Sequence, residues 1–188
     1  MSQDRIEFKG VDRRRWADLE ALFEARGGPH NCWCMVWRDK PGSIKAATGS
    51  ERKSVLKGAL RSRVSGGGPV GILGYCNGAP IAWCSIAPRS SYRPLGGVGD
   101  HQGDDVVWSV ACFFISRKFR GKHIADRLLQ AAIDYARDHG ARIVEAYPVD
   151  PNSPSYRFMG FVGLFDRAGF RKVGSVGARR HVVRLELA

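Results

Sequence analysis

Residues 117–125 read RKFRGKHIA and combine cationic side chains with a glycine just before the start of an expected helix. The first backbone N–H groups of a helix have no partner within the helix and lie at the positive end of its dipole. Such a turn suits a phosphate or pyrophosphate group. The cations that surround it here are Arg117, Lys118, Arg120 and Lys122. The pattern predicts an anion-binding turn, and a basic connection between a strand and a helix is the alternative.

A second group of reactive side chains lies in residues 30–37, which read HNCWCMVW. His30, Cys32 and Cys34 are of the types that bind zinc, but structural zinc sites separate paired cysteines by two to four residues and have a fourth ligand. Neither feature is visible, so we expect no metal site. The interleaved Trp33 and Trp37 indicate an aromatic wall of a pocket, or core beneath the first helix.

The elements around the basic turn can be predicted from apolar spacing. The run VVWSVACFFI at 106–115 is typical of a strand buried on both faces. Residues 124–139 have the spacing of an amphipathic helix, and Gly140 follows where a left-handed residue often ends one. A further strand is expected at 142–147. The turn therefore lies inside a predicted βαβ unit.

The rest of the chain predicts a mixed α/β protein. The elements expected from apolar spacing are a strand at 6–9, helices at 11–26 and 50–63, strands at 70–76 and 79–87, a short helix at 158–167 and a last pair of strands ending with 181–187. Asn77 and Gly78 favour a type I′ turn between the two middle strands. Residues 88–103 show no period and predict a long loop that overhangs a site.

Composition favours one compact domain over residues 1–188, because 44% of the residues are hydrophobic. No stretch approaches the roughly 18–20 apolar residues of a membrane helix, and the N-terminus lacks the apolar core of a signal peptide. The five cysteines are odd in number, which favours reduced thiols, and we expect a cytoplasmic protein. A net charge of +12 favours polyanionic partners but does not separate nucleic acid from a phosphorylated cofactor.

The segment Arg120-Gly121-Lys122-His123-Ile124-Ala125, the helix and strand after it, and LFDRAGF at 164–170 resemble the GNAT N-acetyltransferase superfamily. The pyrophosphate loop of that family has Gln or Arg, two residues, Gly, one residue, then Gly or Ala. Arg120 and Ala125 match this pattern, whereas His123 stands where the middle Gly belongs. The order of the upstream elements agrees as well.

The resemblance implies a mostly antiparallel sheet flanked by helices, with two central strands that splay apart around acetyl-CoA. It implies that the pantetheine pairs with the backbone near Phe113, Phe114 and Ile115. It also implies that the pyrophosphate lies on the amides of Arg120, Gly121, Lys122, His123, Ile124 and Ala125. The side chain of His123 can point outward, contact a phosphate or narrow the turn, and we expect it to point outward.

Acetyl transfer to an amine requires a base, an oxyanion donor and an acid. The family often has a Glu and a Tyr where this chain has Ser109 and Phe165, so those roles do not transfer. Tyr147 and Tyr156 are the predicted substitutes, although either ring can simply pack. Carboxylates that can act through water are Asp104, Asp105 and Glu145. Cys112 can form an acetyl-thioester, but a buried structural thiol is the expected role.

The resulting hypothesis is an acetyl-CoA-dependent N-acetyltransferase acting on a primary amine of a small molecule. Its pocket is expected to consist of Trp33, Trp37, Trp108 and the loop at 88–103. One alternative is an acceptor on aminoacyl-tRNA or on a protein, and another is an inactive module that binds CoA. Nucleic acid alone is less favoured because no binding motif accompanies the charge. No membrane partner is expected, and the final strands can support a homodimer.

Overall fold

The protein is built on one seven-stranded sheet in the order β1-β2-β3-β4-β5-β7-β6. The computed structural model describes residues 4–30, 32–33, 37–38, 49–97 and 106–187. All neighbouring strands pair antiparallel except β4 and β5, which are parallel. The strands are β1 (Ile6–Gly10), β2 (Ile72–Cys76), β3 (Ala79–Pro88), β4 (Val107–Ile115), β5 (Ile143–Ala146), β6 (Arg171–Val176) and β7 (Arg180–Glu186).

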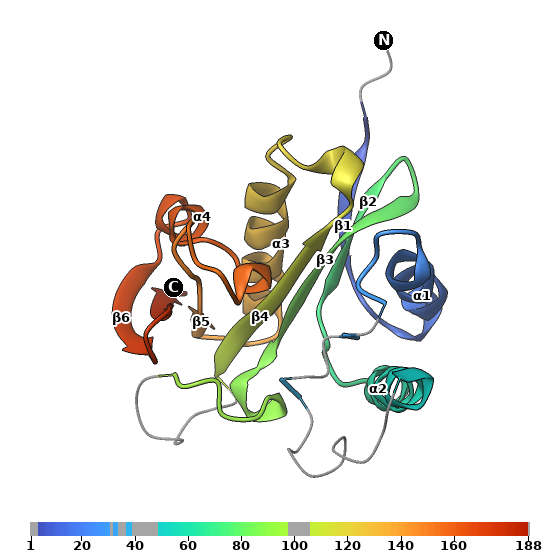
Figure 1. Cartoon of the computed structure of the whole chain (residues 1–188), viewed down its shortest axis with the longest axis horizontal. Helices are drawn as coiled ribbons and strands as arrows, with labels where there is room; N and C mark the ends of the chain where they lie inside the picture. Colours follow the sequence, from blue (N-terminus) through green and yellow to red (C-terminus); the bar gives the residue numbers. More distant parts are fainter. Residues whose placement is uncertain (1–3, 31, 34–36, 39–48, 98–105, 188) are drawn as a thin grey trace.

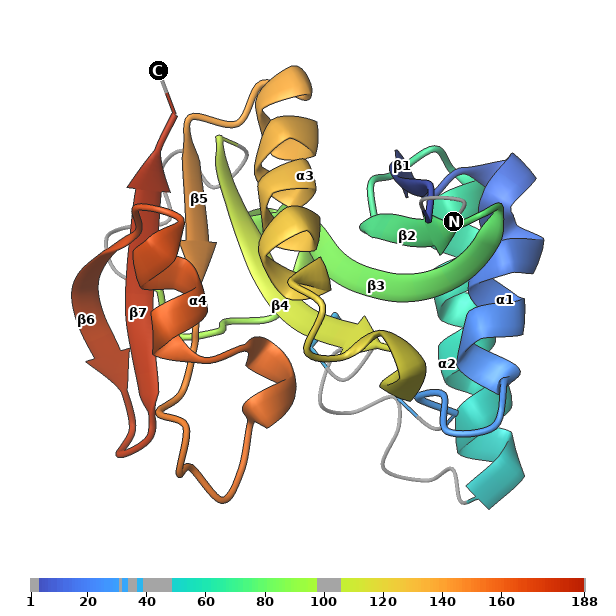
Figure 2. The ribbon, with the colours of Figure 1, turned by 90° about the horizontal axis from the view of Figure 1, so that it is seen from above.

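Helices cover both faces of this sheet (Figures 1 and 2). Apolar residues of α3 (Ile124–Asp138) and α4 (Val162–Arg167) share one core cluster with strand residues such as Val110. A second cluster joins α1 (Trp16–Glu24) and α2 (Gly49–Ser65) to the opposite face, where Trp83 is fully buried. Short 3-10 turns complete the fold: η1 (Arg13–Arg15), η2 (Arg89–Ser91), η3 (Arg117–Phe119) and η4 (Arg157–Met159).

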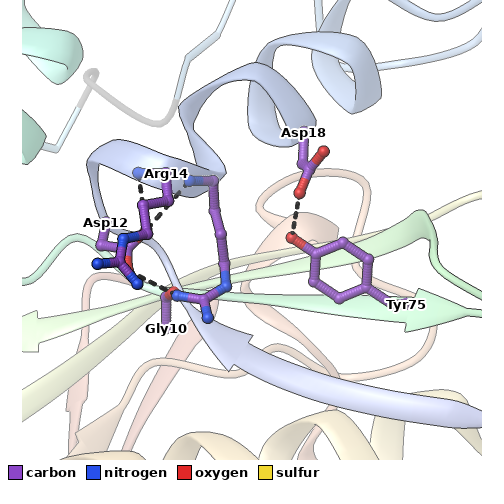
Figure 3. Close-up of polar contacts among 6 residues, drawn as sticks. Gly10, Asp12, Arg14, Asp18 and Tyr75 are labelled. Atoms are coloured by element: carbon purple, nitrogen blue, oxygen red, sulfur yellow. Dashed lines mark hydrogen bonds and ion pairs between the residues drawn. The ribbon is translucent and has the colours of Figure 1, made fainter.

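The 3-10 turn η1, which leads into α1, is capped by Asp12 (Figure 3). Its Oδ1 accepts hydrogen bonds from the backbone N–H groups of Arg14 and Arg15, both at 3.0 Å. This is the interaction of an N-cap, and it satisfies donors that have no helical partner. Further along the helix, the hydroxyl of Tyr75 on β2 donates to Asp18 at 2.8 Å. The bond between Tyr75 and Asp18 ties the first turn of α1 to the sheet.

The predicted elements are confirmed with shifted ends. The helix expected at 11–26 occupies Arg13–Arg15 and Trp16–Glu24 as a 3-10 turn and an α-helix. The short helix expected at 158–167 is divided into η4 and α4, since Gly160 between them has a φ of 90°. Asn77 and Gly78 have φ values of 50° and 83°, as a type I′ turn requires.

The parallel pair β4 and β5 stays together over four residues and then separates. Its register runs from Val107 opposite Ile143 to Val110 opposite Ala146, while β4 continues to Ile115. Past β5 the chain bonds elsewhere. The N–H of Val149 donates to Gly160 at 3.0 Å, and the N–H of His181 donates to the carbonyl of Pro148 at 2.9 Å. Beyond Val110, the edge of β4 that faces β5 therefore pairs with no strand among the described residues.

A bulge in β4 lies at the same place. The register with β3 passes from Val110 opposite Ile86 to Cys112 opposite Ser85, which leaves Ala111 as the extra residue. Val110 and Phe113 belong to the cluster under α3, while Cys112 and Phe114 belong to the cluster on the other face. The bulge thus exchanges the two faces of β4 from residue 112 onward.

Candidate active site

A cavity of about 740 Å³ lies between the free end of β4 and the segment that contains η4 and α4. Its apolar walls include the rings of Phe113, Phe114, Phe158 and Phe161. Its charged lining residues are Arg120, Arg157 and Arg167, and no Asp or Glu is among the described residues that line it. The cavity therefore suits a ligand with a long, partly apolar body and anionic groups.

The turn between β4 and α3 borders this cavity. Arg120 and Ala125 both line it, and the Nε of Arg120 donates to the carbonyl of Ile115 at 3.0 Å. Gly121 and His123 have left-handed backbone conformations, with φ values of 76° and 55°. These two residues turn the chain sharply enough for α3 to begin at Ile124, beside the cavity.

His123 is the residue before α3, and its side chain is 89% exposed. Its backbone conformation is one that glycine adopts without strain, which gives a physical reason for the Gly in the motif that this turn resembles. Its Nδ1 lies 3.7 Å from the carboxylate of Asp126, and the side chain makes no capping hydrogen bond. The imidazole therefore points away from the body of the protein.

Five of the nine residues predicted to hold the cofactor line the cavity: Phe113, Phe114, Ile115, Arg120 and Ala125. The other four, Gly121, Lys122, His123 and Ile124, form the turn between Arg120 and Ala125. Their side chains differ in placement. Ile124 is buried under the sheet, and the Nζ of Lys122 lies 5.6 Å from the ring centre of Phe119.

Tyr147 lies in a buried polar network rather than at an open surface. Its hydroxyl donates to Oε1 of Glu145 at 2.5 Å and lies 3.2 Å from the Oγ of Ser109. Glu145 also accepts from Arg184 at 2.7 Å and lies 3.6 Å from Arg89. Burial, reinforced by the Glu145 carboxylate, raises the pKa of Tyr147 far above its usual range. The phenol is fully buried, and these bonds satisfy its hydroxyl within the core.

Tyr156 has a different environment. It is half-buried, and its ring centre lies 6.3 Å from that of Phe158, which lines the cavity. Its hydroxyl makes no hydrogen bond to the part of the chain that the structure describes. Its φ of 59° is unusual for a bulky residue, and such strain is concentrated at functional sites. Of the two predicted tyrosines, Tyr156 has the hydroxyl that is free to meet a ligand.

The three tryptophans predicted to line the acceptor pocket lie in different places. Trp33 is fully buried and stacks on Trp16 with ring centres 5.9 Å apart, so it belongs to the core under α1, which was the alternative expectation. Trp108 is 2% exposed and packs against Tyr135 of α3 at 5.9 Å, which removes it from the pocket. Trp37 is half-buried and lies 6.3 Å from Tyr156.

The remaining reactive groups are accounted for by packing or fall outside the described residues. Cys112 is 7% exposed within the cluster under α1 and α2, and its thiol lies 3.8 Å from the carbonyl of Phe113. No group of three His, Cys, Asp or Glu side chains able to hold a metal occurs in the described ranges. Cys34, Asp104, Asp105 and residues 98–103 of the predicted overhanging loop lie outside those ranges.

Several residues of the cavity were not predicted from the sequence. Arg157 and Phe158 come from η4, and Arg167 comes from the end of α4. The Nη1 of Arg157 donates to the carbonyl of Pro151 at 2.6 Å, which fixes the loop after β5. Arg167 was within the recognised LFDRAGF segment, but only the folded chain brings it opposite residues 120–125.

No helix in the described part of the chain has both the length and the apolar character needed to cross a membrane.

The separating parallel pair, the left-handed turn before α3 and the arginine-lined cavity beside the end of β4 define the architecture of an α/β protein. Residues 50–164 match the model of the acetyltransferase (GNAT) family. The match covers more than half of the chain, and the protein belongs to this family.

Solved structures give the same fold at low sequence identity. A GCN5-related N-acetyltransferase from Kribbella flavida has a TM-score of 0.57 and 18% identity over 97% of this chain and 98% of its own. The yncA protein from Salmonella typhimurium, solved with its cofactor acetyl-CoA, has a TM-score of 0.56 and 16% identity over 97% and 94%. PaiA N-acetyltransferase from Thermoplasma acidophilum, in complex with coenzyme A, has a TM-score of 0.56 and 11% identity over 97% and 99%. No curated protein matches the sequence.

Proposed function

We propose that this protein transfers an acetyl group from acetyl-CoA to the primary amine of a small molecule. The observation that carries the proposal is the 740 Å³ cavity beside the end of β4, beyond the last residue that pairs with β5. Its apolar walls suit the pantetheine arm, and the cationic turn at 120–125 suits the pyrophosphate. The residues proposed to hold the donor are Phe113, Phe114, Ile115, Arg120 and Ala125, together with the backbone of 121–124.

In the proposed reaction the acceptor nitrogen forms a bond to the thioester carbon while the carbon–sulfur bond breaks. The nitrogen must lose one proton, which passes to solvent water, and the departing sulfur must gain one. We assign the second transfer to Tyr156, because its hydroxyl is uncommitted and its ring lies next to Phe158 in the cavity wall. Tyr147 is assigned to holding the end of β5 in place through Glu145 and Ser109.

The surroundings of Tyr156 support an acceptor that carries an anionic group in addition to its amine. The guanidinium of Arg180 lies 5.1 Å from the ring centre of Tyr156 and 5.2 Å from that of Trp37. Arg93 lies 4.8 Å from the ring centre of Trp37. These two cations lie beside Trp37 and Tyr156, where we propose that the acceptor binds. They repel a polyamine and attract a carboxylate.

The first experiment is a calorimetric titration with acetyl-CoA, with CoA and ATP as comparison ligands. We expect saturable one-to-one binding that prefers the two CoA ligands, and lack of binding contradicts the proposal. For variants that remove an arginine, the matched control is Arg137→Ala. Arg137 pairs with Asp134 on α3 and does not line the cavity.

Turnover is then measured as thiol release with two amines that differ by one carboxylate, phenylalanine and phenethylamine. We expect faster turnover with phenylalanine and a smaller difference in Arg180→Ala. Equal rates with both amines in the wild type contradict the anionic acceptor.

A further inference from the structure

Arg167 forms an ion pair that connects two walls of the cavity. Its Nε and Nη2 both donate to Oδ1 of Asp126, at 2.9 and 2.7 Å. Asp126 lies in the first turn of α3, directly after Ala125, and Arg167 ends α4. Two hydrogen bonds to one oxygen restrict the orientation of the planar guanidinium. Arg167 is therefore held in a fixed position at the edge of the cavity.

The remaining nitrogen of this guanidinium lies close to another residue that lines the cavity. A methyl group built on Gly163, which lines the cavity, would lie 3.7 Å from Nη1 of Arg167. Within the described residues, Nη1 has no hydrogen-bond acceptor. The side chain is 62% exposed, so a ligand can reach it from solvent. The pairing with Asp126 thus leaves one N–H edge available at the cavity mouth.

The two other arginines of the cavity occupy different positions. Arg120 borders the turn proposed to bind the pyrophosphate and is bonded to Ile115. Arg157 is bonded to the loop after β5 through Pro151 and Ser153. CoA carries a second anionic group, the 3′-phosphate of its ribose, which is separated from the pyrophosphate by the sugar. The Arg167 guanidinium, bonded to the residue that follows Ala125, lies next to the proposed pyrophosphate turn and matches this second phosphate in charge.

We propose that Arg167, oriented by Asp126, binds the 3′-phosphate of CoA and makes the protein select CoA over 3′-dephospho-CoA. The inference rests on the proposed function, since it requires the donor to lie in this cavity. It assigns a role in donor selection to a residue outside the turn at 120–125.

The test is a calorimetric titration of the full-length protein with CoA and with 3′-dephospho-CoA. We expect the wild type to bind CoA about tenfold more tightly, as one charge-assisted hydrogen bond near solvent allows. Arg167→Ala should lose about tenfold for CoA and less than twofold for 3′-dephospho-CoA. Arg167→Gln, which keeps the length but not the charge, should show the same loss of preference. Arg137→Ala should behave as the wild type.

Three results overturn the inference, and they are distinguishable. Equal losses for both ligands in Arg167→Ala mean that Arg167 contacts the pyrophosphate or only maintains the cavity. Unchanged binding of both ligands means that the 3′-phosphate lies elsewhere. A wild-type protein that binds neither ligand refutes the proposed donor site as well.

Discussion

His123→Gly should stabilise the protein without changing its affinity for CoA. The φ of 55° at His123 is left-handed, and this conformation costs an L-residue roughly 1–2 kcal/mol. Glycine avoids this cost. Its greater conformational entropy in the unfolded chain, however, destabilises the folded state by roughly 0.5–1 kcal/mol. The expected net gain is about 0.5–1 kcal/mol, or a rise in Tm of roughly 2–3 °C for a chain of this size.

The assay combines thermal or denaturant unfolding with a titration of CoA. Because the imidazole is 89% exposed and makes no capping hydrogen bond, we expect the affinity to stay within about twofold. His123→Ala is the matched control, since it removes the imidazole but keeps the left-handed strain. It should leave both stability and affinity unchanged. A tenfold loss of CoA affinity in either variant refutes the reasoning, because the side chain would then contact a phosphate.

Three further predictions test the site and its support. Arg120→Glu should weaken CoA binding at least about tenfold in calorimetry, because it places a carboxylate beside the pyrophosphate turn; unchanged affinity places the site elsewhere. Glu145→Gln should lower the free energy of unfolding, measured by urea denaturation, by about 2–3 kcal/mol, because it weakens the buried bonds to Tyr147 and Arg184. A loss below about 0.5 kcal/mol, which is typical of surface substitutions, contradicts this prediction. Tyr156→Phe should reduce kcat by about 100-fold with donor affinity unchanged, whereas Tyr147→Phe should mainly lower the free energy of unfolding. A large loss of kcat in Tyr147→Phe and none in Tyr156→Phe contradicts this assignment of the two tyrosines.

Local patterns were sufficient to predict the elements around the site. The apolar run of β4, the helical spacing of α3 and the Asn77-Gly78 turn each depend on a few neighbouring residues, and all three are confirmed. The spacing of Glu145 on β5 and Tyr147 directly after this strand also carries a signal for the buried network, since residues two apart in an extended chain share a face.

Placement of the aromatic residues depends on distant parts of the chain. Composition cannot separate a tryptophan in a pocket wall from one in the core, and Trp108 is buried because Tyr135 of α3 and His139, directly after it, pack on it. Arg167 gains its position from Asp126, which lies 41 residues earlier in the sequence. Such pairs are set by tertiary packing, so neither segment alone indicates them.

The bulge at Ala111 explains how one strand can form both walls of the cleft. Simple alternation from Val110 would place Phe114 on the face covered by α3, but the extra residue moves Phe114 to the face of α1 and α2 and leaves Phe113 with α3. Both rings line the cavity. Among the described residues, the strand edge between them pairs with no neighbouring strand, because β5 ends at Ala146. The face change and the separation of the strands occur within one residue of each other. A ligand bound along this free edge would therefore have side chains from both faces of the sheet around it. The end of the ligand nearest Val110, where β4 and β5 separate, would face the cluster that contains Ala111, Met159 and Tyr156. The acceptor that we propose beside Tyr156 would meet the ligand at this end.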